Sequence, residues 1–423
     1  MPLSFLKYKH ELSDSIWLFV LQGLNYLAPL LVWPYMILVL GAEGFGQIGF
    51  AVMLCQFLML FVDFGFNLTA TKQIALCKEE KEAISRIFWD TLFAKLLLLL
   101  IAAVVLLIIV SIPKYTIYKA TSLILFSMVI GHTFSFLWLY QGLGEIRKVS
   151  IITSICRLGI LPLVFVLVKD ENDVLTAAWV QASTYLASGI VVVTATWLRR
   201  IICIPQGGLI CLRTIGQTLR NSAPIFLSTA LSSVYSLLFV VILGYFSSPI
   251  EVGKYTAVEK IMRGGTNLIL MPVLQAFFPK VSQLGHTNPA SAKRTTGWIL
   301  CGIMVMMGIL CVVLYFFSDE LMRIMGKSYE GIAPVYRIMA FVPLTVGMSG
   351  VLGQLGLIAQ GGKREKRRFC IVYAIAAIAS LVMIFSVGAD LDACHTALSL
   401  LVAELLCGAG MTIYYTLFKI RKE

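Results

Sequence analysis

Charged residues inside long apolar stretches are the first candidates for chemistry in this sequence. Seven of them carry the argument: Asp63, Arg157, Glu259, Lys260, Arg263, Arg337 and Glu404. A charge surrounded by hydrocarbon is costly unless it is paired or faces a watery cavity. Each of these residues is therefore a candidate for binding a charged ligand or for transferring an ion.

Three of the seven lie together in GKYTAVEKIMRGGTNLILMPVLQAFFPKV (253–281). Glu259 and Arg263 are four residues apart, so in a helix they share one face in the order that favours an ion pair. With Lys260, the group predicts a cavity wall that receives an anion, because guanidinium and ammonium groups bind phosphate. An ion pair that only locks two helices together is the alternative. Gly264–Gly265 and Pro272 predict a break in this helix, as in transporter helices around a site.

Asp63 lies within FVDFGFNLTATKQIA (61–75), close to the expected cytoplasmic end of its span. It is either a cap or ion-pair partner near Gly65, Asn67 and Lys72, or a titrating group that couples transport to an ion gradient. Both interpretations stay open. Glu404 is the second candidate for ion coupling.

The remaining buried cations have simpler alternatives. Arg157 lies about 10 Å from the cytoplasmic surface, where it either lines a cavity or extends to the headgroups. Arg337 lies near the opposite face, and both arginines join the candidate anion site. Lys95 is close enough to its helix end that we expect its ammonium group to reach water. The glycines that follow Arg337 at 347, 350, 353 and 356 indicate either tight packing or a helix that bends.

The elements that hold these residues are transmembrane helices. The 423 residues are 59% hydrophobic and 13% charged, with a mean hydropathy of +0.89, whereas a soluble domain is about a quarter charged. The sequence predicts an all-α polytopic membrane protein with about twelve helices. The expected spans are 15–39, 46–70, 90–112, 120–141, 150–168, 175–198, 222–246, 254–279, 297–317, 332–359, 369–388 and 395–418.

The lysines and arginines predict the orientation of these spans. One set of loops and termini holds 23 of them, and the opposite loops hold six: Lys114, Lys119, Lys169, Lys254, Arg323 and Lys327. Because basic residues gather on the cytoplasmic side, both termini are expected in the cytoplasm. The formal net charge of +12 then reflects topology and anionic lipid headgroups, and nucleic acid is not an expected partner.

Two halves of the chain show a weak internal similarity. LGAEGFGQIGFA (40–51) and LGYFSSPIEVGKYTA (243–257) follow the first and seventh spans, and 199–221 is the longest linker. The sequence predicts two six-helix lobes, 1–205 and 206–423, in the manner of transporters built from repeated bundles.

Motifs for catalysis or metal binding do not stand out. GFGQIG (44–49) matches GxGxxG but joins two spans, so we interpret it as a tight turn. No Walker A, HExxH or GxSxG sequence occurs, no CxxC pair occurs among ten cysteines, and the four histidines are dispersed. The N-terminus does not resemble a cleavable signal peptide. We expect no enzyme activity, cofactor or metal.

Several stretches share one resemblance, and the clearest are LGAEGFGQIGFA, FVDFGFNLTATKQIA, SFLWLYQGLGE (135–145) and GKYTAVEKIMRG with PVLQAFFPKVSQL (272–284). Together they resemble the Wzx-type O-antigen flippases of the multidrug/oligosaccharidyl-lipid/polysaccharide (MOP) exporter superfamily. This resemblance implies two lobes around a central cavity that work by alternating access. It implies flipping of undecaprenyl-pyrophosphate-linked oligosaccharide repeat units from the cytoplasmic to the periplasmic leaflet of the bacterial inner membrane. It also implies coupling to an ion gradient, contact with membrane lipids, and other polysaccharide-assembly proteins as a further partner class.

Two other classes of membrane protein remain as alternatives. A multidrug or cation antiporter of the same fold would have an acidic and aromatic cavity instead of a basic one. A membrane polysaccharide polymerase or ligase would need a large periplasmic loop with reactive groups, whereas the expected periplasmic loops are short. A purely structural scaffold would not need charges inside its spans.

Overall fold

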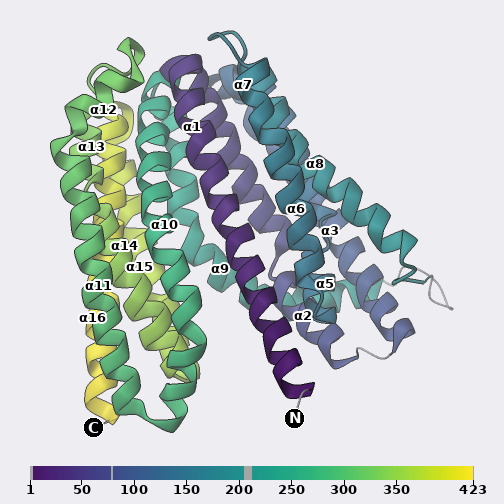
Figure 1. The fold of residues 1–423 in the computed structure, drawn as a ribbon. Coiled ribbons are helices and arrows are strands. Elements are labelled where there is room, and N and C mark those ends of the chain that lie inside the picture. The colour runs from purple at the N-terminus through teal and green to yellow at the C-terminus, as the bar shows by residue number, and fades with distance from the viewer. Residues whose placement is uncertain (1–2, 78–79, 204–211, 423) are drawn as a thin grey trace. The chain divides into compact units, whose positions relative to one another are not determined.

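The chain folds into helices that are long enough to cross a membrane (Figure 1). The computed structural model describes residues 3–77, 80–203 and 212–422, and every regular element in these ranges is a helix. Among the described residues, ten helical stretches of 22 to 46 residues are apolar enough to span a bilayer, which confirms the all-α membrane architecture. The number twelve stays a prediction. Leu31–Leu76 holds part of the expected span 15–39 and all of the expected span 46–70, and only Leu237–Phe246 represents the expected span 222–246.

The helices form two compact units, which we call the first unit and the second unit. The first unit comprises Ala51–Ala230 and the part of α1 (Leu3–Asp63) that ends at Val32. The second comprises Trp33–Phe50 and the chain from Leu231 onward. The lobe boundary expected between residues 205 and 206 lies in 204–211, outside the described residues, and stays a prediction.

The order of helices along the chain is as follows. The helices that follow α1 up to the link between the units are α2 (Phe66–Leu76), α3 (Lys81–Val110), α4 (Lys119–Thr133), α5 (Leu137–Leu143), α6 (Ile146–Ile160), α7 (Val164–Leu167), α8 (Val174–Leu198) and α9 (Leu212–Phe246). The second unit continues with α10 (Pro249–Thr287), α11 (Pro289–Phe316), α12 (Ser318–Met325), α13 (Ala333–Met339), α14 (Val342–Gly350), α15 (Lys363–Val387) and α16 (Ala393–Lys422). A π-helical segment, Val351–Ile358, continues α14.

In the first unit, α4 and α8 approach so closely that glycine is required where they cross. A Cβ atom on Gly131 of α4 would collide with the backbone carbonyl of Tyr185 on α8. A Cβ atom on Gly189 of α8 would lie 2.7 Å from the carbonyl oxygen of Gly131. Small residues allow this backbone contact between membrane helices. The crossing brings His132 of α4 and Ser188 of α8 to the wall of one cavity.

In the second unit, the two segments with similar sequences pack against each other. A Cβ atom on Gly253 of α10 would collide with the carbonyl oxygen of Ala42, and one on Gly46 would collide with that of Pro249. The tight turn expected at 44–49 is wrong, because the chain is helical there and its kink lies at Gly41 (φ 64°). Gly46 and Gly49 of GFGQIG serve helix packing rather than a turn.

The kink at Gly41 is held by a buried tyrosine. The Tyr329 hydroxyl donates to the Gly41 carbonyl oxygen at 3.1 Å. Burial raises the pKa of the Tyr329 hydroxyl above its ordinary value, so the group keeps its proton and remains a donor.

Two expectations about helix continuity have different outcomes. α10 runs through Gly264–Gly265 and Pro272 as one helix, so the predicted break is wrong. A membrane offers no water to backbone groups that a break would release, which favours the unbroken helix. After Arg337 the backbone does change, into the π-helix Val351–Ile358. A Cβ atom on Gly347, 350, 353 or 356 would lie within 2.6–3.0 Å of a neighbouring side chain, which favours the tight-packing interpretation.

Candidate functional site

Glu259 and Arg263 on α10 form the ion pair that their spacing predicts. Arg263 Nε donates to Glu259 Oε1 at 2.8 Å, and the exposed fraction of the side chain is 1% for Glu259 and 31% for Arg263. Lys260 is buried, with Nζ 4.7 Å from the centre of the Trp33 ring. This distance is typical of a cation–π interaction. Each of the two cations therefore has a partner within the second unit.

Two further polar groups lie in the same region of the second unit. Tyr255 is fully buried and interacts electrostatically with Glu259, Arg263 and the buried Glu404 of α16. Glu259 Oε2 and the Tyr255 hydroxyl have no hydrogen-bond partner among the described residues. The cluster thus combines two cations with two carboxylates, so its formal charge is balanced.

Asp63 ends α1, and its carboxylate meets three groups of the first unit. Lys95 Nζ of α3 donates to Oδ1 at 2.8 Å, and His132 Nε2 of α4 lies 2.8 Å from Oδ2. Asn67 Nδ2 of α2 donates to Oδ2 at 3.1 Å. Of the two structural alternatives, the ion pair forms, but with Lys95 rather than Lys72, and no side chain caps α2.

The expected extension of Lys95 to water is wrong. Its side chain is only 2% exposed, because the ammonium group turns inward to Asp63. A charge that finds an opposite charge inside the bundle does not need to reach the headgroups.

The Asp63 network lies where the backbone breaks between α1 and α2. Phe64 and Gly65 have positive φ angles of 41° and 81°. A positive φ is strained for a bulky residue such as Phe64 and requires support from its surroundings. The Phe64 ring stacks on Phe226 of α9 with centroids 4.5 Å apart, and the hydroxyls of Thr69 and Ser222 are 2.7 Å apart. The network therefore sits beside the helix that leads to the second unit.

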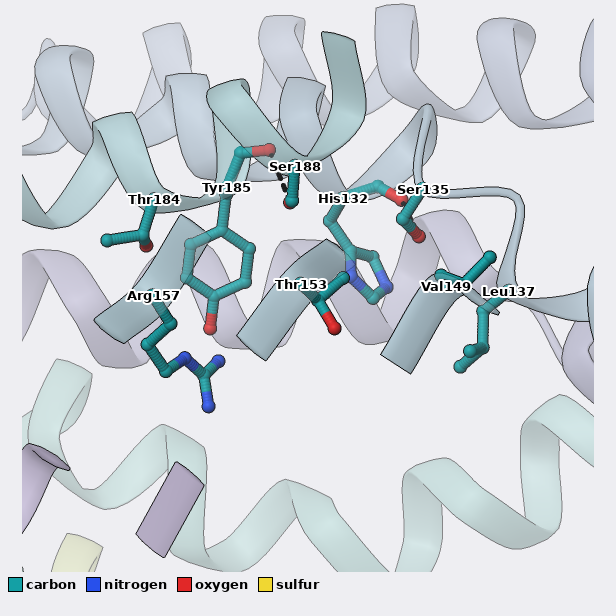
Figure 2. A pocket seen from close by; sticks show the side chains of 9 residues that line it. All are labelled: His132, Ser135, Leu137, Val149, Thr153, Arg157, Thr184, Tyr185 and Ser188. Atoms are coloured by element: carbon teal, nitrogen blue, oxygen red, sulfur yellow. Dashed lines mark hydrogen bonds between the residues drawn. The ribbon is translucent and has the colours of Figure 1, made fainter. Parts of the chain in front are cut away.

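A cavity of about 180 Å³ opens on the other side of His132, wholly within the first unit (Figure 2). Its lining residues come from α4, α5, α6 and α8 and the short loop after α4: His132, Ser135, Leu137, Val149, Thr153, Arg157, Thr184, Tyr185 and Ser188. Val149, Thr153 and Arg157 are spaced by four residues, which places them on one face of α6. In Figure 2 the Arg157 guanidinium and the hydroxyls of Thr153 and Tyr185 point to the same side.

Arg157 is the cation of this cavity. Its guanidinium carbon lies 5.9 Å from the centre of the Tyr185 ring. Within the part of the chain that the structure describes, no carboxylate or other acceptor binds Arg157. A guanidinium offers five N–H donors and stays charged. The side chain is therefore suited to an anion that enters the cavity.

Arg337 is bound by residues of α12. Its Nη2 donates to Asp319 at 2.9 Å and its Nε donates to the Ser318 hydroxyl at 3.2 Å, and both partners are on α12. The structure thus gathers Glu259, Arg263 and Glu404 around Tyr255. Arg337 instead pairs with Ser318 and Asp319.

Sequence reasoning missed the histidine that links the Asp63 network to the cavity. The four dispersed histidines form no metal-binding motif, so the sequence assigns no role to His132. Its signal was a polar ring within the apolar run LILFSMVIGHTF, well inside the expected span 120–141. The i, i+4 spacing of Thr153 and Arg157 was also visible in the sequence.

Comparison with known proteins begins with a family model. The model of the polysaccharide biosynthesis protein family matches residues 12–285. This chain belongs to that family. Two curated relatives carry the name "Putative O-antigen transporter". The one from Escherichia coli (strain K12) is 29% identical over 407 residues and covers 95% of each chain. The one from Shigella dysenteriae is 30% identical over 404 residues, 93% of this chain and 97% of its own.

Solved structures show where this polysaccharide biosynthesis protein belongs by fold. An inward-facing multidrug resistance MATE transporter of the MOP superfamily matches with a TM-score of 0.70 at 12% identity, covering 94% of each chain. The lipid II flippase MurJ, in an inward closed conformation, matches with a TM-score of 0.73 at 12% identity, covering 95% of this chain and 87% of its own. At such identity these matches show the fold alone. Family and fold together confirm the resemblance to the Wzx-type branch of the MOP superfamily.

Proposed function

We propose that this protein flips undecaprenyl-pyrophosphate-linked oligosaccharide repeat units of the O-antigen class across the bacterial inner membrane. The substrate moves from the cytoplasmic to the periplasmic leaflet by alternating access of two lobes, and both termini lie in the cytoplasm. Family membership and the names of the two relatives support the substrate class. The excess of basic residues on one set of loops supports the orientation.

One observation carries the proposal: Arg157 lines a cavity inside a membrane-spanning segment, with only the Tyr185 ring as partner among the described residues. A charge at this depth is costly, and a ligand anion would compensate it. A diphosphate fits, because arginine binds phosphate through paired N–H groups. Lys260 and Arg263 are proposed as a second contact for the headgroup, with Glu259 holding Arg263 in place. Arg337 is left out, since Asp319 and Ser318 hold its guanidinium.

Transport against a gradient needs a drive, and we place the coupling ion, a proton, at Asp63. The carboxylate lies between Lys95 and His132 at 2.8 Å from each, so gain or loss of one proton changes the charge balance of the whole network. His132 also lines the cavity, which supports communication between the proton and the substrate. Glu404, buried near Tyr255, is the second candidate.

Arg157→Gln and Arg263→Gln test the headgroup contacts in a strain whose only copy of the gene carries the variant. We expect surface polysaccharide to fall about tenfold or more, since a hydrogen bond to a charged group is worth about 1.5–3 kcal/mol. Arg323→Gln, on the exposed face of α12, is the matched control and should keep normal levels. Membrane levels of each variant are measured by immunoblot. Normal surface polysaccharide in both test variants would exclude the proposed headgroup contacts.

The cation antiporter of the same fold makes the opposite prediction. A positive guanidinium in the cavity disfavours an organic cation, so Arg157→Gln would raise drug efflux in that case. Efflux measured in the same strains separates the two functions.

A further inference from the structure

Apart from the Arg157 guanidinium and the Tyr185 hydroxyl, the polar side chains of the cavity wall in the first unit present hydrogen-bond acceptors. Each of its four Ser and Thr hydroxyls donates its proton to the backbone carbonyl three residues earlier. The four bonds are Ser135 to His132 at 2.8 Å, Thr153 to Ser150 at 3.0 Å, Thr184 to Gln181 at 2.8 Å and Ser188 to Tyr185 at 2.9 Å. A hydroxyl that has donated its one proton retains lone pairs. These four oxygens can therefore accept hydrogen bonds from a ligand.

His132 adds to this pattern in its neutral form. Its Nε2 lies 2.8 Å from Asp63 Oδ2, and an ionised carboxylate can only accept, so Nε2 carries the hydrogen. Nδ1 of a neutral ring is then an acceptor. The charged and titratable groups about His132 are Asp63, with Lys95 behind it, and Arg157 across the cavity.

The combination of acceptors, one cation and one aromatic ring selects a class of ligand. A negative charge complements Arg157, and O–H or N–H donors, which an ionised diphosphate lacks, complement the four hydroxyl oxygens. The Tyr185 ring offers an apolar face for C–H groups. A sugar ring with an anionic substituent supplies all three: hydroxyl donors, an apolar ring face and a charge. An organic cation supplies no anion for Arg157.

We propose that this cavity is the subsite for one sugar ring that bears an anionic group, with the anion at Arg157 and the ring hydroxyls on Thr153, Ser188, Ser135 and Thr184. The inference rests on the proposed flippase function and adds to it a contact that recognises sugar. The volume of about 180 Å³ is below the 300–1,000 Å³ of pockets for drug-sized ligands, which suits a single ring. Two sources share this chemistry: the sugar next to the lipid diphosphate, and an acidic sugar elsewhere in the repeat unit.

Soluble probes and the full-length protein in lipid nanodiscs test this subsite. N-acetylglucosamine 1-phosphate represents the first source, methyl glucuronide the second, methyl N-acetylglucosaminide lacks the anion, and inorganic pyrophosphate lacks the donors. Dissociation constants of the sugars come from saturation-transfer NMR, and that of pyrophosphate from displacement. We expect one of the two anionic sugars to bind about tenfold more tightly than either the neutral sugar or pyrophosphate, and its identity decides the source.

Variants then distinguish the contribution of the hydroxyl oxygens from that of the Arg157 guanidinium. In Thr153→Val with Ser188→Ala, the affinity for the anionic sugar should fall about tenfold while that for pyrophosphate is unchanged. Thr194→Val is the matched control, because Thr194 makes the same kind of backbone bond, to Ile190 at 2.8 Å, on an exposed face of α8. It should leave both affinities unchanged.

Three outcomes would overturn the inference: no binding of either anionic sugar, equal affinity for the neutral sugar, or an equal loss for sugar and pyrophosphate in the double variant. Any of these, together with loss of surface polysaccharide in Arg157→Gln, would leave the flippase proposal standing without a sugar subsite. Normal surface polysaccharide in both Arg157→Gln and Arg263→Gln would instead reject the headgroup contacts themselves.

Discussion

The Asp63 carboxylate contacts side chains from three different helices. Asn67, Lys95 and His132 belong to α2, α3 and α4, so the carboxylate ties together helices that are well separated in sequence. A buried ion pair of this kind is costly to break, because the remaining charge has no water to replace its partner. Asp63 therefore has a structural role in addition to the proton coupling that we propose.

Lys95→Met tests the structural part of this role. The variant leaves Asp63 with one positive partner fewer, and we expect the free energy of unfolding to fall by about 3 kcal/mol. Thermal unfolding of the purified protein in detergent measures the loss. Asp63→Asn combined with Lys95→Met removes both charges and should recover most of the stability. If the single variant is as stable as the parent chain, the ion pair does not contribute to folding.

The crossing of α4 and α8 determines whether the cavity exists. Two of its wall helices, α4 and α8, can approach as closely as they do because Gly131 and Gly189 have no side chain. The positions of Thr184, Tyr185 and Ser188 relative to α4 therefore depend on residues that have no side chain. A substitution far from ligand chemistry can abolish the site by separating these two helices.

Gly131→Ala should separate them. The added methyl group would collide with the Tyr185 backbone, and we expect a loss of about 2 kcal/mol in stability, the cost of overpacking. Gly302→Ala on α11 is the control, because a Cβ atom there meets nothing within 4 Å and alanine favours a helix. Unfolding temperatures of the two variants are compared in the same detergent. Equal stability of Gly131→Ala and the parent chain would contradict the close approach.

At the scale of single elements, apolar length was a better guide than helix-breaking residues. Hydropathy predicted the helices on which Lys95, Arg157 and Glu404 lie. The glycine pair and Pro272 predicted a break in α10 that does not form, because intrinsic propensity is a weak guide where the surroundings contain no water. The kink lies at Gly41 and not in the expected turn at 44–49. Its neighbours form a helix because α10 packs on them.

The topology of the whole molecule rests on the distribution of basic residues. Fluorescent protein fused after Glu423 should fold and fluoresce, because it stays in the cytoplasm, whereas alkaline phosphatase inserted after Asp170 should be active in the periplasm. The controls are the two reverse fusions, with the fluorescent protein after Asp170 and alkaline phosphatase after Glu423. An active phosphatase at the C-terminus would reverse the assignment and the direction of flipping with it.

Composition and the spacing of Glu259 and Arg263 were sufficient to predict the class of fold and one ion pair. The partners of Asp63 and the cavity of Arg157 were not predictable, because they join residues up to 69 positions apart. Such contacts depend on which helices lie side by side, and hydropathy carries no information about neighbours. The family resemblance supplied the class of transport, but not the residues of the subsite.

The packing of 40–51 on 243–257 limits which chimaeric proteins of this family can fold. The second unit includes Trp33–Phe50, which comes from the N-terminal part of the chain. A chimaeric protein that joins two relatives within the linker 199–221 would therefore pack α10 of one relative against the Gly46 segment of the other. At Gly46 and Gly253 the two surfaces touch backbone to backbone, with no side chain at these two points to absorb a mismatch. Chimaeric proteins joined within this linker should therefore fold only when both relatives have glycine at the positions of Gly46 and Gly253.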